Sequence, residues 1–395
     1  MAASRIVELA SVIQNSTSSI DAHLAQENLP SPSFDAEQPS AVLDNAKIKD
    51  ARQAILEATD ELHSLMLGPA IYHFGFATSF PAGKHEATFA EIATASGVPE
   101  PLVQRLLRHA MTNRIFCEPR EGIVAHTAAS KFLAENKDAR EWSDGLIPGI
   151  QIIRVTIALI DSQGYNIAHN TNRTIFGEIS QDTARENRYG AAMAWFATRP
   201  DLQAQYVVDG FDWASLGAGT VVDVGGSYGT LSVAIGRNFP LLHFIVQDQR
   251  EVVETARQVL PEEMKNRVKF LGHDFFTEQP IKEAQVYLLR WILHDWSDKY
   301  AITIIRALAR AMGPRSRIVV CEQVMPTPGS ISAYQERAMR GLDLAMLEVH
   351  NARERSVEDW ATLFASADSR LQLQNVRRPE GSRLSFLEVA LSEGR

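Results

Sequence analysis

The sequence predicts an α/β protein whose second half folds as a doubly wound parallel sheet, and three observations carry that prediction. From residue 220 onward, short apolar runs alternate with helical segments, the pattern of parallel strands joined by helices that cover both faces of a sheet. Gly225, Gly226 and Gly229 form a tight turn between the first of these runs and the helix after it. Polar residues end the apolar runs, at the edge where such sheets bind ligands.

The N-terminal part of the 395-residue chain predicts two long helices. Residues 1–25 carry apolar side chains at helical spacing, a Pro- and Ser-rich linker follows over 27–40, and a second helix is expected over 47–67. An apolar helical pair ahead of the main domain favours packing against a second copy of the chain. We therefore expect a homodimer.

Residues 88–133 predict a helix, a turn at Gly97, a second helix and a short β-hairpin, the order of a winged helix-turn-helix. Such motifs often read DNA, but the chain carries a formal net charge of −9. That charge leaves no basic footprint for nucleic acid or for an anionic membrane. A DNA-binding regulator is therefore the least favoured class of function.

Residues 142–206 predict several helical segments that are rich in aromatic side chains. Core packing accounts for most of them, while some would line an apolar pocket for a flat substrate, with Met193 and Phe196 as first choices. We expect a helical winged-helix domain over 1–140, a helical pocket segment over 141–206 and the α/β domain over 207–395.

Within the α/β part, strands are expected at 220–224, 243–248, 268–275, 284–293 and 317–324, with a closing hairpin over 371–376 and 384–391. The carboxyl ends of parallel strands share one edge of a sheet, so polar residues at these ends are candidate site residues. They are Asp223, Asp248, Asp274, Arg290, His294 and Glu322.

The glycine turn indicates a particular ligand chemistry. Its pattern, D-x-G-G-x-x-G from Asp223, differs from the G-x-G-x-x-G of dinucleotide sites, and an acid beside the turn would repel a pyrophosphate. Asp248, about 25 residues later, has the spacing of a ribose-binding carboxylate. A ligand with an ammonium group and a ribose fits both acids, and S-adenosylmethionine has both.

His294 is a candidate general base. Glu322 ends the next strand and would lie beside His294, and Glu354 could supply a second carboxylate from the start of a later helix. A carboxylate that accepts the ring N–H fixes the tautomer and raises the basicity of the other nitrogen. No histidine–carboxylate cluster has metal spacing and no serine sits in a nucleophile elbow, so metal and covalent mechanisms are disfavoured.

The remaining composition indicates a cytoplasmic protein. Cys117 and Cys321 are too few for a disulfide framework, so a reducing compartment fits. The N-terminus does not have the pattern of a signal peptide, and no apolar run is long enough to span a membrane.

Taken together, these motifs resemble the caffeate-type class of S-adenosylmethionine-dependent O-methyltransferases, a cation-independent class I family, and in particular its fungal secondary-metabolism branch. The resemblance covers nearly the whole chain. It is specific in the combination of VDVGGSYG, Asp248, HDF at 273–275, LHDWSD at 293–298 and NARERS at 351–356. It implies a Rossmann-like methyltransferase domain preceded by an N-terminal winged-helix dimerisation domain.

The resemblance also implies a role for each site residue. The methionine part of the cofactor would lie at Asp223, Gly225 and Gly226, the ribose at Asp248, and the adenine near Asp274 and Phe275. Arg290 stands where the family often has a cofactor-contacting lysine. Catalysis falls to His294, Glu322 and Glu354, and Met346 is similar to a substrate-contacting methionine.

Three features depart from the family pattern: Ser227 replaces a third glycine, Gln247 and Gln249 flank Asp248 in place of a D-L-P segment, and His273 stands where glycine is common. We expect methyl transfer to a phenolic or enolic hydroxyl of a small aromatic or polyketide-type secondary metabolite. A cofactor-binding pericyclase of the same family is the alternative. Members of that kind tend to lose the basic histidine, which this chain keeps.

Overall fold

The computed structural model describes residues 5–31, 46–67, 75–81, 84–135, 177, 181 and 199–392. Met193 and Phe196 lie outside these residues, as does nearly all of the expected pocket segment. The chain forms two compact units, residues 1–151 with 326–342, and residues 152–325 with 343–395. The boundaries at 140 and 206 stay predictions.

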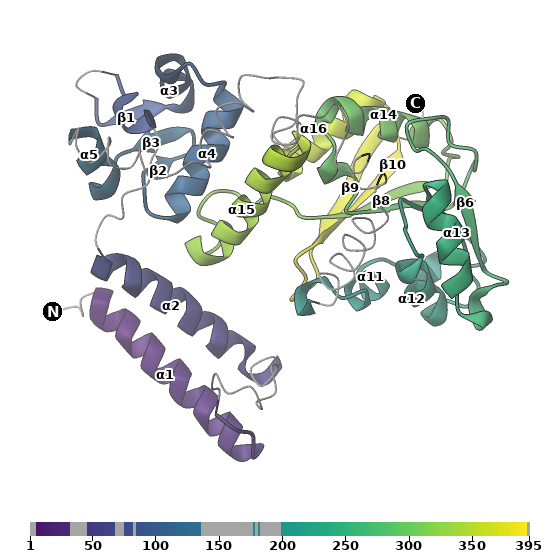
Figure 1. Ribbon diagram of the computed structural model, residues 1–395, viewed down its shortest axis with the longest axis horizontal. Helices are drawn as coiled ribbons and strands as arrows, with labels where there is room; N and C mark the ends of the chain where they lie inside the picture. The colour runs from purple at the N-terminus through teal and green to yellow at the C-terminus, as the bar shows by residue number, and fades with distance from the viewer. Residues whose placement is uncertain are drawn as a thin grey trace. The chain divides into compact units, whose positions relative to one another are not determined.

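The first unit begins with two helices that lie side by side, α1 (Arg5–Gln26) and α2 (Lys49–Leu67) (Figure 1). Ile20 and Leu24 of α1 pack on Ile48, which belongs to the short helix η1 (Ala46–Ile48) just before α2. The guanidinium of Arg5 donates two hydrogen bonds to Glu61, 2.8 and 2.7 Å long. The two N-terminal helices predicted from apolar spacing are therefore present.

After the short helix η2 (Gly75–Thr78), the same unit contains β1 (Glu86–Thr88), α3 (Phe89–Ser96), α4 (Glu100–Thr112), β2 (Cys117–Arg120), β3 (Ile123–Ala125) and α5 (Ala128–Glu135). Thr88 and Glu91 cap α3 reciprocally, and Gly97, at φ 72°, ends it in the left-handed region. The three strands form an antiparallel sheet in the order β1-β3-β2. Two helices and a hairpin follow one another as predicted, while a dimerisation role stays a prediction.

The first half of α15 (Ala333–His350) also belongs to the first unit. Ser332 donates a hydrogen bond to Glu57 of α2, and Arg337 binds both Asp60 of α2, at 2.8 Å, and the carbonyl of Thr112 in α4, at 2.6 Å. The sequence pattern did not indicate that residues 326–342 belong to the same unit as the N-terminal helices.

The second unit is built on a seven-stranded sheet in the order β6-β5-β4-β7-β8-β10-β9. The first five strands along the chain run parallel, and β10 pairs antiparallel with both β8 and β9. The sheet is therefore mixed, with the predicted closing hairpin at one edge. The strands are β4 (Thr220–Val224), β5 (His243–Asp248), β6 (Val268–Gly272), β7 (Val286–Arg290), β8 (Arg317–Glu322), β9 (Leu371–Arg377) and β10 (Ser385–Leu391).

Helices cover both faces of this sheet, as the alternating pattern predicts. Along β7, Tyr287 and Leu289 pack toward α14 (Asp298–Ala309) and α16 (Val357–Ala367). Val286 and Leu288 pack toward α12 (Thr230–Asn238) and α13 (Arg250–Val259) on the other face. Short helices complete the unit: η3 (Pro200–Leu202), α11 (Gln205–Gly210), η4 (Trp213–Leu216), η5 (Glu262–Met264) and η6 (Leu293–Asp295).

Across the described ranges, no helix is both long and apolar enough to cross a membrane.

Candidate active site

The glycine turn after β4 needs glycine for steric reasons. Gly225 has φ +71°, and a Cβ on it would lie 2.4 Å from Cδ1 of Ile292. A Cβ on Gly226 would lie 2.5 Å from Cγ of Asp223. Both glycine N–H groups donate to the carbonyl of Gln247, at 2.8 and 3.1 Å. The turn is thus held tightly against the end of β5, and its two glycines leave room for the side chains of Ile292 and Asp223, which a Cβ would displace.

The two acids predicted around this turn lie close to it. Asp223 is buried and accepts a 2.6 Å hydrogen bond from the hydroxyl of Ser232, while burial raises its pKa to about 6. Asp248 accepts the N–H groups of Ser227 and Gln249, each at 2.8 Å, and burial raises its pKa as well. Ser227 is therefore compatible with the turn, because its backbone N–H binds the Asp248 carboxylate.

Asp274 and Phe275 follow β6 at the same edge of the sheet. Asp274 is exposed and accepts the N–H of Phe276 at 3.0 Å. Phe275 approaches the turn, since its ring lies 3.9 Å from a Cβ built on Gly225. Its ring also meets Trp296 edge to face, with 5.9 Å between the centroids. Trp296 was not singled out from the sequence, although it belongs to the LHDWSD motif.

Two buried nitrogens at this edge have no hydrogen-bond partner within the described residues. Arg290, at the end of β7, donates from Nη2 to the carbonyl of Leu202 at 2.6 Å, but its buried Nε is unsatisfied. Burial lowers the pKa of Arg290. Nε2 of His273, next to Asp274, is also buried and unsatisfied. Such atoms are costly unless a ligand or water pairs with them, so these groups fit a polar cofactor that binds beside the glycine turn.

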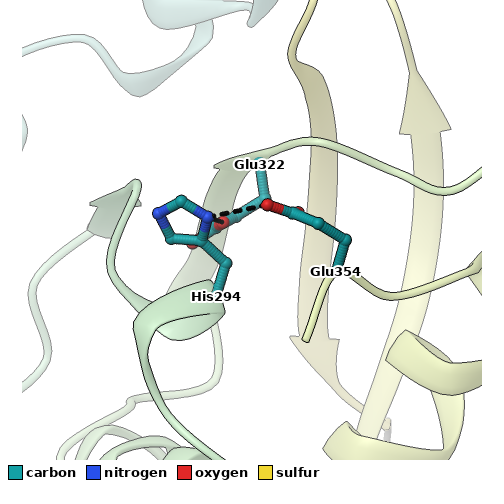
Figure 2. Close-up of side chains that lie close together, drawn as sticks. All are labelled: His294, Glu322 and Glu354. Carbon is teal, nitrogen blue, oxygen red and sulfur yellow. Dashed lines mark hydrogen bonds and ion pairs between the residues drawn. The ribbon is translucent and has the colours of Figure 1, made fainter. Parts of the chain in front are cut away.

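His294, Glu322 and Glu354 meet in one buried cluster, in which the imidazole ring points toward both carboxylates (Figure 2). Nδ1 of His294 lies 2.9 Å from Oε1 of Glu354 and 3.9 Å from Oε2 of Glu322. Because an ionised carboxylate only accepts, Nδ1 carries the proton in the short contact. That leaves Nε2 as the nitrogen that can take a proton from a substrate.

Glu322 owes its orientation to the loop that carries His294. Its Oε1 accepts the N–H groups of Ile292, at 3.0 Å, and Leu293, at 2.9 Å. Trp291 has φ +55°, and Ile292 follows in the right-handed region. Successive residues of opposite hand turn their N–H groups toward one point and bind an anion there. The left-handed backbone of Trp291 costs roughly 1–2 kcal/mol and builds this anion-binding nest.

Glu354 is held from two sides. Its backbone N–H donates to Asp343 at 2.9 Å. The next residue, Arg355, is fully buried and donates to the carbonyls of Leu293 and Trp296, both at 2.9 Å. Arg355 thereby ties the segment after α15 to the loop that carries His294, which explains how two residues 60 positions apart come into contact.

Asp295 is a third carboxylate near His294, and the sequence pattern did not identify it. Its Oδ1 lies 3.5 Å from Nε2 of His294 and 3.4 Å from Nε2 of His350. Burial lowers the pKa of His294, but the charges of Asp295, Glu322 and Glu354 outweigh that effect and raise it to about 10. Burial raises the pKa of Glu322 to about 7. With a pKa of about 10, the imidazole ring of His294 is strongly basic.

Two further points concern the predicted residues. Met346 lies half-buried on α15, in the part of that helix that belongs to the second unit. The ligand atoms of His294, Glu322 and Glu354 lie within 4.8 Å of one another, close enough to enclose a small cation. The 2.9 Å contact between Nδ1 of His294 and Glu354 has the length of a hydrogen bond, so the arrangement is better suited to proton transfer.

Residues 157–369 match the O-methyltransferase domain family. Among known proteins, the chain is 37% identical to a grayanic acid biosynthesis cluster O-methyltransferase of Cladonia grayi, over 98% of this chain and 88% of that protein. It is 34% identical to the O-methyltransferase PaMT of Phomopsis amygdali, over 99% of this chain and 97% of that protein.

The chain is also similar to an O-methyltransferase whose structure was solved with ligands bound. The O-methyltransferase NcsB1 of neocarzinostatin biosynthesis, in complex with S-adenosylmethionine and 2-hydroxy-5-methyl naphthoic acid, superposes with a TM-score of 0.51 at 25% identity. The match covers 84% of this chain and 96% of that one. With a glycine turn between two acids and a domain match over more than half its length, the chain belongs to the S-adenosylmethionine-dependent O-methyltransferases.

Proposed function

We propose that the protein methylates a phenolic or enolic hydroxyl of a small aromatic or polyketide-type metabolite, with His294 as the general base. The observation that carries the proposal is the 2.9 Å contact between Nδ1 of His294 and Glu354 inside a buried cluster. That contact commits Nδ1 as a donor, so in the unprotonated ring Nε2 is the nitrogen that accepts from the acceptor hydroxyl.

The residues around the glycine turn would hold the cofactor. Asp248 would accept from the ribose hydroxyls, Asp223 and the turn would face the methionine part, and Asp274 and Phe275 would border the adenine. Arg290 would contact the cofactor through its unsatisfied Nε. When bound, S-adenosylmethionine supplies an electrophilic methyl group on a positively charged sulfur.

The catalytic residues would then act on the acceptor. Nε2 of His294 takes the proton of the hydroxyl, and the carboxylates of Glu354 and Glu322 stabilise the imidazolium that forms. The deprotonated oxygen would then accept the methyl group that bound S-adenosylmethionine supplies, with S-adenosylhomocysteine as the leaving group. Burial of the cluster excludes water from the proton transfer, so positioning and a strongly basic ring supply much of the rate.

Support for the class of acceptor comes from relatives. NcsB1 was solved with hydroxynaphthoic acids, which are flat aromatic phenols, and one fungal relative is named for the grayanic acid biosynthesis cluster. We propose Met346, together with Met193 and Phe196 of the undescribed segment, as substrate contacts. We also propose that the enzyme is a cytoplasmic homodimer that dimerises through its N-terminal winged-helix part.

The test counts S-adenosylhomocysteine formed per molecule of product when the protein is incubated with S-adenosylmethionine and a panel of flat phenols. We expect one per product. We also expect His294→Ala to lower the rate by roughly 10²–10⁴ without changing the affinity for S-adenosylhomocysteine. As a control, His243→Ala alters an exposed histidine at the start of β5 and should leave the rate unchanged. Product formed without S-adenosylhomocysteine would overturn the proposal and favour pericyclic catalysis.

A further inference from the structure

Gln247 and Gln279 form a buried pair of amides, although they are 32 positions apart in the chain. Nε2 of Gln247 donates to Oε1 of Gln279, and Nε2 of Gln279 donates to Oε1 of Gln247, both at 2.8 Å. Each residue is 1% exposed. The N–H of Ile281 also donates to Oε1 of Gln279, at 3.1 Å, which fixes the side of that amide on which the oxygen lies. Two directional hydrogen bonds therefore join the pair.

Gln247 connects this pair to the glycine turn and to the acid proposed to bind the ribose. It precedes Asp248 at the end of β5. Its carbonyl accepts the N–H groups of Gly225, at 2.8 Å, and Gly226, at 3.1 Å. One residue thus holds the glycine turn through its backbone and Gln279 through its side chain.

The loop over 273–281, which follows β6, is attached to β5 at two points. At its start, the N–H of His273 donates to the carbonyl of Asp248 at 2.9 Å. Near its end, Gln279 binds the side chain of Gln247. The two residues proposed to border the adenine lie between these attachments, so the pair closes the loop against the strand that carries the ribose acid.

A buried amide pair contributes geometry more than stability. Replacing two buried hydrogen-bonded groups by apolar groups of similar shape is nearly neutral for folding, and Ile245 and Val246, which precede Gln247 in β5, are apolar residues packed in the cores of the sheet. Hydrogen bonds, unlike apolar contacts, fix both a distance and a direction. The pair is therefore suited to holding the loop and the strand in one arrangement.

We infer that Gln247 and Gln279 are positioning residues for the cofactor, because they hold the loop that borders the adenine in place against the glycine turn and the ribose acid. The inference rests on the cofactor contacts set out under the proposed function. A loop that is already in its binding arrangement does not have to be ordered when the cofactor binds. Loss of the pair should therefore weaken cofactor binding without unfolding the sheet.

The double variant Gln247→Met with Gln279→Met removes both amides and keeps unbranched side chains. We expect the dissociation constant for S-adenosylhomocysteine, measured by calorimetry, to rise about 10-fold, as for a site whose binding arrangement is populated one-tenth of the time. In the cofactor-free protein, the amide hydrogens of residues 273–281 should exchange faster. The melting temperature should stay within about 4 °C of wild type, because one backbone N–H, that of Ile281, loses its acceptor.

Gln285→Met is the matched control. The side chain of Gln285 accepts the N–H of Thr220 at 2.6 Å, at the edge of the sheet where the parallel strands begin. This variant also takes an acceptor from a backbone N–H, but away from the cofactor, so the affinity and the exchange over 273–281 should not change.

Gln279→Glu is the conservative variant. A carboxyl group at this position can accept from Gln247 and Ile281, and burial favours its protonated form, which donates as the amide does. It should retain most of the affinity for S-adenosylhomocysteine.

An unchanged dissociation constant in the double variant, or unchanged exchange over 273–281, would overturn the inference. A melting temperature about 10 °C lower would also overturn it, since the pair would then support the whole fold. If the wild-type protein does not bind S-adenosylhomocysteine, the proposed cofactor site fails instead, and the exchange comparison still decides whether the pair holds the loop.

Discussion

At the scale of single residues, the unusual feature is that His294 has a carboxylate near each ring nitrogen. Glu354 accepts from Nδ1, and Asp295 lies 3.5 Å from Nε2. The first contact orients the ring, and the second adds to its basicity at Nε2, the nitrogen that we propose faces the acceptor. Asp295 follows His294 directly in the sequence, but only the tight turn of η6 brings its side chain back to the ring, so a pattern of residue types could not identify it.

The raised pKa of His294 predicts how activity depends on pH. With a pKa of about 10, the unprotonated fraction of the ring grows through the neutral and alkaline range, so kcat/KM should rise with pH from 7 toward 10. Glu354→Gln removes one negative neighbour and lowers the pKa, so the same rise should occur at lower pH. Rate profiles of the two proteins with one acceptor check this. Coincident profiles would contradict it.

The same shift has a consequence for stability. The pKa of His294 is about 10 in the folded protein and about 6.5 in the unfolded chain. Its stabilising contribution is therefore complete below pH 6.5 and is lost as the pH rises toward 10. The difference in unfolding free energy between wild type and His294→Ala should accordingly shrink over that range.

Asp248 offers a residue-scale test of the cofactor site. Asp248→Ala should weaken binding of S-adenosylhomocysteine strongly, since each hydrogen bond to a charged acceptor contributes roughly 1.5–3 kcal/mol. The carboxylate also holds the N–H groups of Ser227 and Gln249, so Asp248→Asn, which keeps one acceptor oxygen, should retain more affinity. Calorimetry on both variants measures this. Equal affinity in Asp248→Ala and wild type would move the ribose to another part of the site.

At the scale of elements, the loop from Trp291 to Asp295 follows β7, carries His294 and is held together by Glu322 from β8. Glu322 accepts hydrogen bonds from two backbone N–H groups of this loop, so the carboxylate has a structural role besides its charge. A glutamine can accept the same two bonds, whereas an alanine leaves both N–H groups without an acceptor. The two substitutions therefore separate the structural role from the electrostatic one.

We expect Glu322→Gln to fold nearly as stably as wild type and to transfer methyl more slowly at alkaline pH, where the ring is unprotonated in both proteins, because a His294 with a lower pKa is a weaker base. Glu322→Ala should in addition be destabilised by about 1–3 kcal/mol for each unsatisfied N–H, which lowers the melting temperature by several degrees. Thermal melts and initial rates of both variants test this. Equal melting temperatures would show that the loop does not depend on the carboxylate.

Much of this element-scale arrangement could be predicted from the sequence, and the exceptions have physical causes. β4, β7 and β8 are buried on both faces, so their residues form continuous apolar runs that are easy to recognise. The hairpin of β9 and β10 was predicted, but its insertion beside β8 depends on the pairing of Ser385 with Glu322, which no local pattern encodes. The left-handed backbone of Trp291 could not be predicted either, because bulky residues such as tryptophan normally avoid that conformation.

At the scale of the whole molecule, each of the two units has its own internal contacts, and α15 contributes to both. The first unit depends on Arg337 and Ser332, which bind Asp60 and Glu57 of α2. The sequence could not reveal this dependence, because polar residues on a helix surface usually face solvent. The homodimer that we propose would be formed by this same unit.

Deleting residues 1–67 should leave monomeric or aggregated protein, because the truncation removes both N-terminal helices and the carboxylates that bind Arg337 and Ser332. The double variant Glu57→Gln with Asp60→Asn is the control. It weakens the contacts with α15 but keeps both helices, so it should have the oligomeric state of wild type. Light scattering measures all three proteins. A truncated chain that is soluble and of unchanged mass would rule out assembly through these helices.

The ion pair between Asp60 and Arg337 also sets an order of events during synthesis on the ribosome. The two residues are 277 positions apart, and at roughly 5–20 residues per second the ribosome needs about 14–55 s to travel between them. During that interval α2 has left the exit tunnel without its partner from α15, so the acidic side chains of Glu57 and Asp60 are open to chaperones or to another nascent copy. The N-terminal unit, although translated first, is completed only after most of the catalytic sheet has emerged.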